Sequence, residues 1–97
     1  MIAKNRGGFS ELVACAWLMS LGYDVFRNTS DNGPIDMVAV DRDTGETVFV
    51  DSKTITPTSV KSVRKNGYKR SPKQKALNVR IVGVTHESEC FWVTHKD

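Results

Sequence analysis

The chain has 97 residues, of which 39% are hydrophobic and 26% are charged, and its formal net charge at pH 7 is +3. These values are typical of one small soluble domain with a single modest core, and they give no support to a second domain. No apolar run approaches the roughly 18 residues of a transmembrane helix, and the start, residues 1–6, lacks a signal-peptide core. We therefore expect one domain, residues 1–97, in the cytoplasm and away from membranes.

The first helix is predicted over residues 8–21, because apolar residues recur at helical spacing. Its predicted apolar stripe consists of Phe9, Leu12, Val13, Ala16, Trp17 and Leu21. Leu18 and Met19 widen this stripe, so we expect the helix to be mostly buried. Gly22 is placed to end it, and Glu11, the only acid in the helix, lies in its first turn, where the helix dipole favours a carboxylate.

Three strands are predicted next, at residues 23–27, 35–41 and 46–53. The polar cluster 28–34 separates the first two strands. The turn 42–45 contains a glycine and forms a hairpin, so the second and third strands are expected to be antiparallel.

The second half of the chain is predicted as a loop, a helix and two strands. The loop covers 54–70 with a helical turn near 59–65, the helix runs from a Ser71 cap and Pro72 to about Asn78, and the strands cover 79–85 and 90–94. This order predicts an α/β fold in which helices flank a mixed five-stranded sheet. The fourth strand can return parallel to the third through a crossover.

Cys15 and Cys90 are the only cysteines, and they lie far apart in apolar surroundings. A disulfide is conceivable, but two buried thiols in a reducing compartment are the favoured interpretation. Neither they nor His86 and His95 have the paired spacing of a structural zinc site, and we expect both histidines at the surface.

Basic residues gather in one block of the sequence. They are Lys61, Arg64, Lys65, Lys69, Arg70, Lys73, Lys75 and Arg80, and no acid occurs between Ser52 and His86. Such a block beside an acid-rich half indicates a polyanion that is held against a metal-binding centre. A merely solvated surface is the alternative. Tyr68, among the lysines, is a candidate nucleic-acid contact.

Two strands bring acids and a lysine together. Asp51 and Lys53 are two residues apart and share one face of a strand, while Asp36 begins the neighbouring strand, opposite Asp51 or Ser52. Two carboxylates that meet in this way repel each other unless a cation joins them, and oxygen ligands suit Mg²⁺ or Mn²⁺. Taken singly, Asp36 could end a turn, and Lys53 and Glu11 could be solvated. Asp51 is harder to explain away, because it interrupts a run that should stay apolar.

The segment Gly33–Asp36, followed fifteen residues after its acid by Asp51–Lys53, resembles the signature of the PD-(D/E)xK nuclease superfamily. The helix that carries Glu11, followed by Leu21–Phe26, is similar to the usual order upstream of that signature. The resemblance covers residues 7–55 and is closest to small stand-alone enzymes of the Holliday-junction-resolvase-like and intron homing-endonuclease-like kinds. It implies a restriction-endonuclease-like core of order α-β-β-β-α-β-β.

The resemblance also implies roles for individual residues. Asp36 and Asp51 would bind Mg²⁺ or Mn²⁺, with the Ser52 carbonyl as a further ligand. Lys53 would orient or activate the attacking water, and Glu11 would complete the metal site directly or through water. Asp51 stands where glutamate is commoner, so its carboxylate reaches one methylene less far.

The function that follows is a divalent-metal-dependent DNA endonuclease that hydrolyses phosphodiester bonds, with selectivity for junction or branched DNA as a further expectation. The residues expected to contact nucleic acid are Lys61, Arg64, Lys65, Lys69, Arg70, Lys73, Gln74 and Lys75. A catalytically inactive binding module and an RNA-cleaving enzyme are the alternatives. Cutting both strands requires at least a homodimer, and the resemblance allows a tetramer and a setting in a prokaryotic or phage-infected cell.

Overall fold

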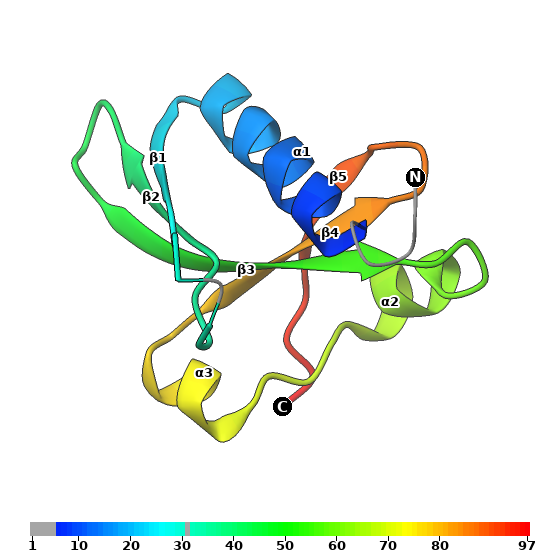
Figure 1. The fold of residues 1–97 in the computed structure, drawn as a ribbon. Coiled ribbons are helices and arrows are strands. Elements are labelled where there is room, and N and C mark those ends of the chain that lie inside the picture. Colours follow the sequence, from blue (N-terminus) through cyan, green and yellow to red (C-terminus); the bar gives the residue numbers. More distant parts are fainter. Residues whose placement is uncertain (1–5, 31) are drawn as a thin grey trace.

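The computed structural model describes residues 6–30 and 32–97 and has the element order α-β-β-β-α-α-β-β over these ranges (Figure 1). The elements are α1 (Arg6–Ser20), β1 (Tyr23–Arg27), β2 (Met37–Asp41), β3 (Thr47–Ile55), α2 (Val60–Asn66), α3 (Pro72–Ala76), β4 (Arg80–Thr85) and β5 (Cys90–Val93). The prediction from the N-terminal stretch concerns residues 1–5, which lie outside the described residues. None of the described helices is long and apolar enough to cross a bilayer.

The five strands form one sheet in the order β1-β2-β3-β4-β5. Neighbouring strands are antiparallel except for β3 and β4, which are parallel. The parallel pair needs a crossover, and α2 and α3 supply it. The α/β class, the mixed five-stranded sheet and the flanking helices are therefore confirmed, and they are compatible with the core that the resemblance implies.

The β2–β3 hairpin is built by its turn. The Asp41 carboxylate accepts hydrogen bonds from the backbone N–H groups of Asp43 (2.8 Å) and Thr44 (3.1 Å). Gly45 follows with a φ of +78°, a conformation that glycine adopts without strain. The turn fixes the register that pairs Met37 with Val50, and this register positions the acids discussed below.

The crossover helices differ in extent from the prediction. The helical turn expected near 59–65 is the helix α2. Ser71 caps α3 as predicted, in a capping box in which Ser71 Oγ accepts from the Gln74 N–H and the Gln74 side chain accepts from the Ser71 N–H. However, α3 ends at Ala76 rather than near Asn78, because Asn78 has a φ of +53°, which is incompatible with a continuing helix.

The sheet has a core on each face. The larger core packs α1 against alternate strand residues and contains Ala14, Cys15, Leu18, Met37, Ala39, Val50, Val82 and Val84. The smaller core lies on the α2 face and contains Ile55, Val63, Ile81 and Val93. Figure 1 shows α1 on one side of the sheet and α2 on the other. Alternation along β3 therefore directs Val50 toward α1 and Ile55 toward α2.

The predicted buried face of α1 was wrong in part. Leu18 is fully buried and Val13 and Trp17 pack against the core as expected. However, Phe9, Leu12 and Leu21 are 45%, 57% and 50% exposed, and Ala14, which was not predicted, is fully buried. The helix is apolar around most of its circumference, so periodicity alone does not select a face. Small residues decide it, because Ala14 lets the helix approach the sheet closely.

The predictions for the cysteines and for His86 are confirmed, and the prediction for His95 is wrong. Cys15 and Cys90 are free thiols, buried and half-buried respectively. His86 is exposed as expected, with 54% of its side chain accessible. His95, expected at the surface, is half-buried, and its Nε2 has no hydrogen-bond partner among the described residues. Burial and the nearby Arg70 cation lower the pKa of His95.

Candidate metal and nucleic-acid site

The two strand acids lie side by side. The Asp36 N–H donates to the Val50 carbonyl at 2.8 Å, directly before the Met37–Val50 pair that begins the β2–β3 ladder. The Asp51 carboxyl is close enough to act on the charge of Asp36. One Asp36 carboxylate oxygen, Oδ2, accepts hydrogen bonds from the Ser52 N–H (2.8 Å) and hydroxyl (3.3 Å). The hairpin thus holds Asp36 in place through the backbone N–H of Ser52, the residue after Asp51.

Asp51 is a buried acid with incomplete partners. It is 6% exposed, and its Oδ2 has no hydrogen-bond partner in the described part of the chain. Lys53 Nζ forms an ion pair with this oxygen at 3.2 Å without hydrogen-bond geometry, and the lysine side chain is 41% exposed, so this cation is only partly withdrawn from solvent. A buried carboxylate oxygen without a hydrogen-bond donor lowers the stability of the fold, so the position favours binding of a cation.

The pKa of Asp36 reflects the same crowding. Burial first, and then hydrogen bonding to and repulsion from the Asp51 carboxyl, raise the pKa of Asp36 to about 6, against the lowering effect of the Ser52 hydrogen bonds. The Asp36 carboxyl therefore holds its proton more strongly than a solvated aspartate does. A divalent cation at this position would favour the ionised form of Asp36.

Asn28 organises the loop that leads to Asp36, a role that the sequence interpretation missed. Its Nδ2 donates to the carbonyls of Asn32 (2.7 Å) and Ile35 (2.9 Å), and its Oδ1 accepts from the Ser30 N–H at 2.9 Å. The Asn28 N–H also donates to the Asp36 carbonyl at 2.8 Å. An asparagine at the start of a polar turn cluster was the available signal.

Gln74 contacts the same loop from the opposite half of the chain. It is 8% exposed, and its Nε2 donates to the Pro34 carbonyl at 3.3 Å. Its burial leaves little of the side chain for a nucleic-acid contact. The geometry gives Gln74 a positioning contact two residues before Asp36.

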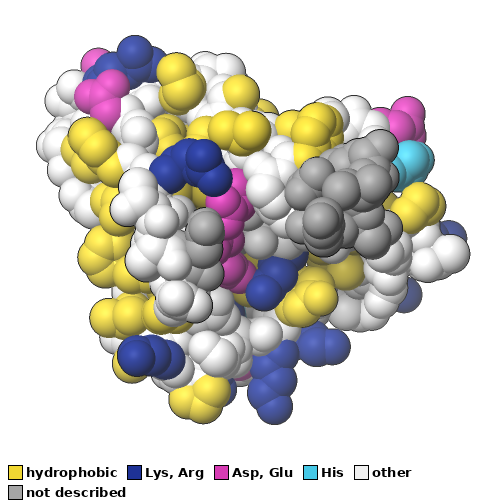
Figure 2. All heavy atoms as spheres, in the orientation of Figure 1, with side chains coloured by type: hydrophobic (Ala, Val, Ile, Leu, Met, Phe, Trp, Pro, Cys, Tyr) yellow, Lys and Arg dark blue, Asp and Glu magenta, His cyan; other side chains and the backbone are white. Residues whose placement is uncertain are grey.

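Glu11 stands slightly apart from the two strand acids. It pairs with Arg27 at 2.8 Å and its side chain is 19% exposed. Burial raises the pKa of the Cys15 thiol, and Arg27, Glu11 and Asp36 each act on it electrostatically, so all three lie in the same part of the molecule. Within residues 6–30 and 32–97, no three His, Cys, Asp or Glu side chains are grouped to hold a metal ion. Figure 2 shows acidic side chains in a strip on one face, with basic side chains at its ends.

The residues expected to bind nucleic acid divide into two groups. The exposed lysines are Lys61 and Lys65 on α2, Lys69 on the connecting segment, and Lys73 and Lys75 on α3. The two arginines are engaged within the molecule. Arg64 lies 3.7 Å from Glu89 and its guanidinium stacks 4.1 Å above the Phe91 ring. Arg70 pairs with Asp97 at 3.0 Å, and only 12% of its side chain is exposed, so Arg70 stabilises the C-terminal segment.

Comparisons of the chain with protein-family models, with curated proteins and with solved structures find no match. The chemistry of the site is therefore inferred from its contacts. Buried Asp51, half-buried Asp36, an adjacent lysine and a nearby ion pair occupy the junction of β2 and β3, and exposed lysines lie on the crossover.

Proposed function

We propose that this chain is a divalent-metal-dependent DNA endonuclease that hydrolyses phosphodiester bonds, with a preference for junction or branched DNA. The observation that carries the proposal is the contact between Asp36 and Asp51, in which one buried carboxylate oxygen lacks a hydrogen-bond donor. A structural role would favour a neutral or fully paired side chain at this position. A cation-binding role explains why two acids are kept together.

The donor set fits Mg²⁺ or Mn²⁺. Both ions prefer oxygen ligands, and Mg²⁺ is commonly bound through one or two carboxylates, with water and substrate phosphate as the other ligands. Asp36 and Asp51 would hold the ion, with the Ser52 carbonyl as a further ligand. When bound, a divalent cation lowers the pKa of water and stabilises negative charge on a phosphate. The 2.8 Å pairing of Glu11 with Arg27 favours contact of Glu11 with the ion through water rather than directly.

Lys53 would supply the fixed positive charge of the site. Its ammonium group is close to Asp51 Oδ2, at 3.2 Å, and is partly exposed, so it can contact a phosphate oxygen while it remains near the carboxylate. There it would orient the attacking water and stabilise the charge that develops on the phosphate. The exposed lysines of α2 and α3 would bind the DNA backbone without reading sequence.

We also propose that the enzyme is a homodimer, because one chain offers one site and two strands must be cut. The exposed apolar side chains of α1 support an interface on its outer side. Leu12 and Met19 are 57% and 56% exposed, and Phe26 on β1 is 61% exposed. Met19 and Phe26 line one surface hollow of about 380 Å³, so these two side chains lie close together. A tetramer would need a second contact.

The test is a cleavage panel with four-way junction, flap, single-stranded and linear duplex DNA, in Mg²⁺ or Mn²⁺ and with an EDTA control. We expect metal-dependent cleavage, fastest on branched DNA, and its loss in Asp51→Asn with DNA binding kept. The matched control is Asp43→Asn, the same change at an exposed hairpin residue. Isothermal titration with Mn²⁺ should show binding to wild type and Asp43→Asn, but not to Asp51→Asn.

Three results would overturn this proposal or redirect it. Full cleavage by Asp51→Asn would remove the assigned site. DNA binding without cleavage in either metal would favour an inactive binding module on a nuclease scaffold. Cleavage of RNA in preference to every DNA substrate would favour the RNA-cleaving alternative.

A further inference from the structure

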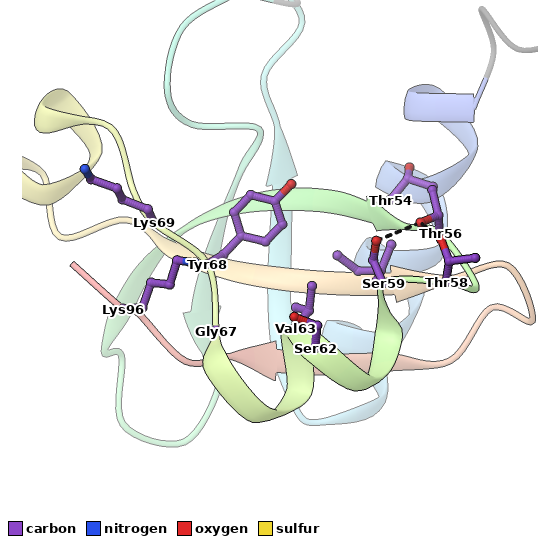
Figure 3. Close-up of a pocket in the computed structure, with 11 residues that line it drawn as sticks. Thr54, Thr56, Thr58, Ser59, Ser62, Val63, Gly67, Tyr68, Lys69 and Lys96 are labelled. Atoms are coloured by element: carbon purple, nitrogen blue, oxygen red, sulfur yellow. Dashed lines mark hydrogen bonds between the residues drawn. The ribbon is translucent and has the colours of Figure 1, made fainter.

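A groove of about 590 Å³ opens on the α2 face of the sheet, between β3, α2 and the segment that follows α2. Hydroxyl-bearing residues form one wall, and Figure 3 shows them gathered at one end of the groove. They are Thr54, Thr56, Thr58, Ser59 and Ser62. On the other side lie Tyr68, Lys69 and Lys96. The groove is not used by the site described above.

The groove and the acid pair share one strand, β3. Asp51, Lys53 and Ile55 alternate onto the same face of β3, and Ile55 lines the groove. At about 3.3 Å per residue, Ile55 lies about 13 Å from Asp51 along the strand. A chain molecule bound at Asp51 would therefore pass Lys53 and enter the groove.

The chemistry of the groove suits phosphate groups. Of the described residues that line it, two are lysines and none is acidic. Three of its hydroxyls bond to one another, as where Thr56 Oγ1 donates to Ser59 Oγ at 3.0 Å. The Thr54 hydroxyl instead bonds to Ser10 Oγ of α1 at 2.6 Å. A hydroxyl can rotate to donate to a bound oxygen, and hydroxyl and lysine side chains are common phosphate ligands.

Tyr68 adds an aromatic surface to this lining. It is 37% exposed, and its ring projects into the groove (Figure 3). Its backbone is fixed on both sides, because the Tyr68 N–H donates to the Thr94 carbonyl at 2.8 Å and its carbonyl accepts from the Lys96 N–H at 3.1 Å. Gly67 permits this pairing, since a Cβ there would collide with the Thr94 carbonyl oxygen. The backbone that carries the ring is therefore held in position before any ligand arrives.

We propose that this groove binds an unpaired, single-stranded segment of DNA beside the phosphate at the acid pair, with one base stacked on Tyr68 and phosphates on the hydroxyls and lysines. A base in a duplex is covered by its neighbours, whereas an unpaired base offers its face for stacking. The inference rests on the proposed nuclease function, because that function places a phosphate of the DNA strand at the acid pair. It narrows the substrate to DNA with a single-stranded arm, such as a flap or an open junction.

The binding test uses a fluorescein-labelled oligothymidylate and a blunt duplex of equal length, in EDTA so that no cleavage occurs. Tyr68→Ala should weaken oligothymidylate binding by about 5- to 100-fold, the usual contribution of one stacked base. Tyr68→Phe keeps the ring and should bind as wild type does. Lys96→Ala should reduce the slope of log affinity against log salt by about 0.7, the value for one phosphate contact on a single strand.

Two results would overturn the groove assignment. One is unchanged oligothymidylate binding in Tyr68→Ala, with circular dichroism showing a folded variant. The other is equal affinity for the blunt duplex. Because binding is measured without metal, the outcome is independent of catalysis. Groove binding without cleavage of any substrate would retain this inference and reject the nuclease, and cleavage without Tyr68-dependent binding would do the reverse.

Discussion

Gln74 Nε2 donates a hydrogen bond to the carbonyl oxygen of Pro34, 3.3 Å away and forty residues distant in the chain. This bond ties α3 to the loop that ends at Asp36. The same side chain completes the α3 capping box through the Ser71 N–H. One buried amide therefore joins the crossover to the acid pair.

The first prediction concerns this amide. Gln74→Ala should lower the free energy of unfolding by about 1–2 kcal/mol, because it removes a cap partner and a buried hydrogen bond. It should also weaken Mn²⁺ binding, since the loop before Asp36 loses a restraint. Urea unfolding and isothermal titration measure the two effects.

Ser71→Ala is its matched control. It removes the Ser71 hydroxyl from the cap but leaves the Gln74–Pro34 bond, so it should destabilise by about 1 kcal/mol and leave Mn²⁺ affinity unchanged. Equal losses of Mn²⁺ affinity in the two variants would show that the helix, and not the Pro34 contact, matters to the site.

The second prediction is a pH dependence of the metal-free protein. The pKa of Asp36 is raised from 3.8 to about 6 on folding, so the folded state binds more protons than the unfolded state between these values. The stabilising contribution is complete below pH 4 and is lost as the pH rises through 6, in total about 2–3 kcal/mol. Urea unfolding in EDTA from pH 4 to 8 measures it.

Asp36→Asn isolates this contribution from those of other groups. His95 has a lowered pKa and acts with the opposite sign, losing stability as the pH falls below its ordinary value of 6.5. The difference between wild type and Asp36→Asn removes the His95 effect. A difference that stays constant from pH 4 to 8 would contradict the assignment.

The third prediction is that removing the second acid stabilises the metal-free fold. Asp51→Asn relieves repulsion and the burial of an incompletely paired carboxylate, and we expect a gain of about 1–3 kcal/mol at pH 7. Lys53 loses its partner at little cost, because its side chain is 41% exposed. Thermal or urea unfolding measures the gain. A less stable Asp51→Asn would indicate that the acid is structural.

The fourth prediction compares two glycines with similar backbone conformations. Gly67 and Gly45 have φ values of +81° and +78°. A Cβ at Gly67 meets the Thr94 carbonyl, whereas a Cβ at Gly45 meets nothing within 4 Å. Gly45→Ala should cost about 1 kcal/mol, and Gly67→Ala at least about 2 kcal/mol more. Equal costs by urea unfolding would contradict the close pairing at Thr94.

The fifth prediction concerns the proposed dimer. Leu12→Glu places a charge on the outer face of α1 and should convert a dimer to monomers, as measured by sedimentation velocity. Leu77→Glu is the control, because Leu77 is also exposed, at 38%, but lies at the end of α3. A wild-type monomer, or a Leu12→Glu variant that remains dimeric, would exclude this interface.

The sequence by itself determined the structure that depends on residues close together in the chain. A short turn connects β2 and β3, and a two-residue side-chain period fixes which residues share a face. For this reason the antiparallel β2–β3 pairing, and the closeness of Asp36 to the end of β3, followed from spacing alone. Ser71 and Pro72 likewise located the start of α3, because capping depends on neighbouring residues.

Only the tertiary structure decided which segments distant in sequence contact one another. Periodicity left the buried face of α1 open, since the helix is apolar on several sides, and packing of Ala14 and Leu18 selected it. The Gln74–Pro34 bond and the groove beside Tyr68 each join segments separated by long stretches of chain. Such contacts depend on how the crossover folds back over the sheet, and no local pattern specifies that.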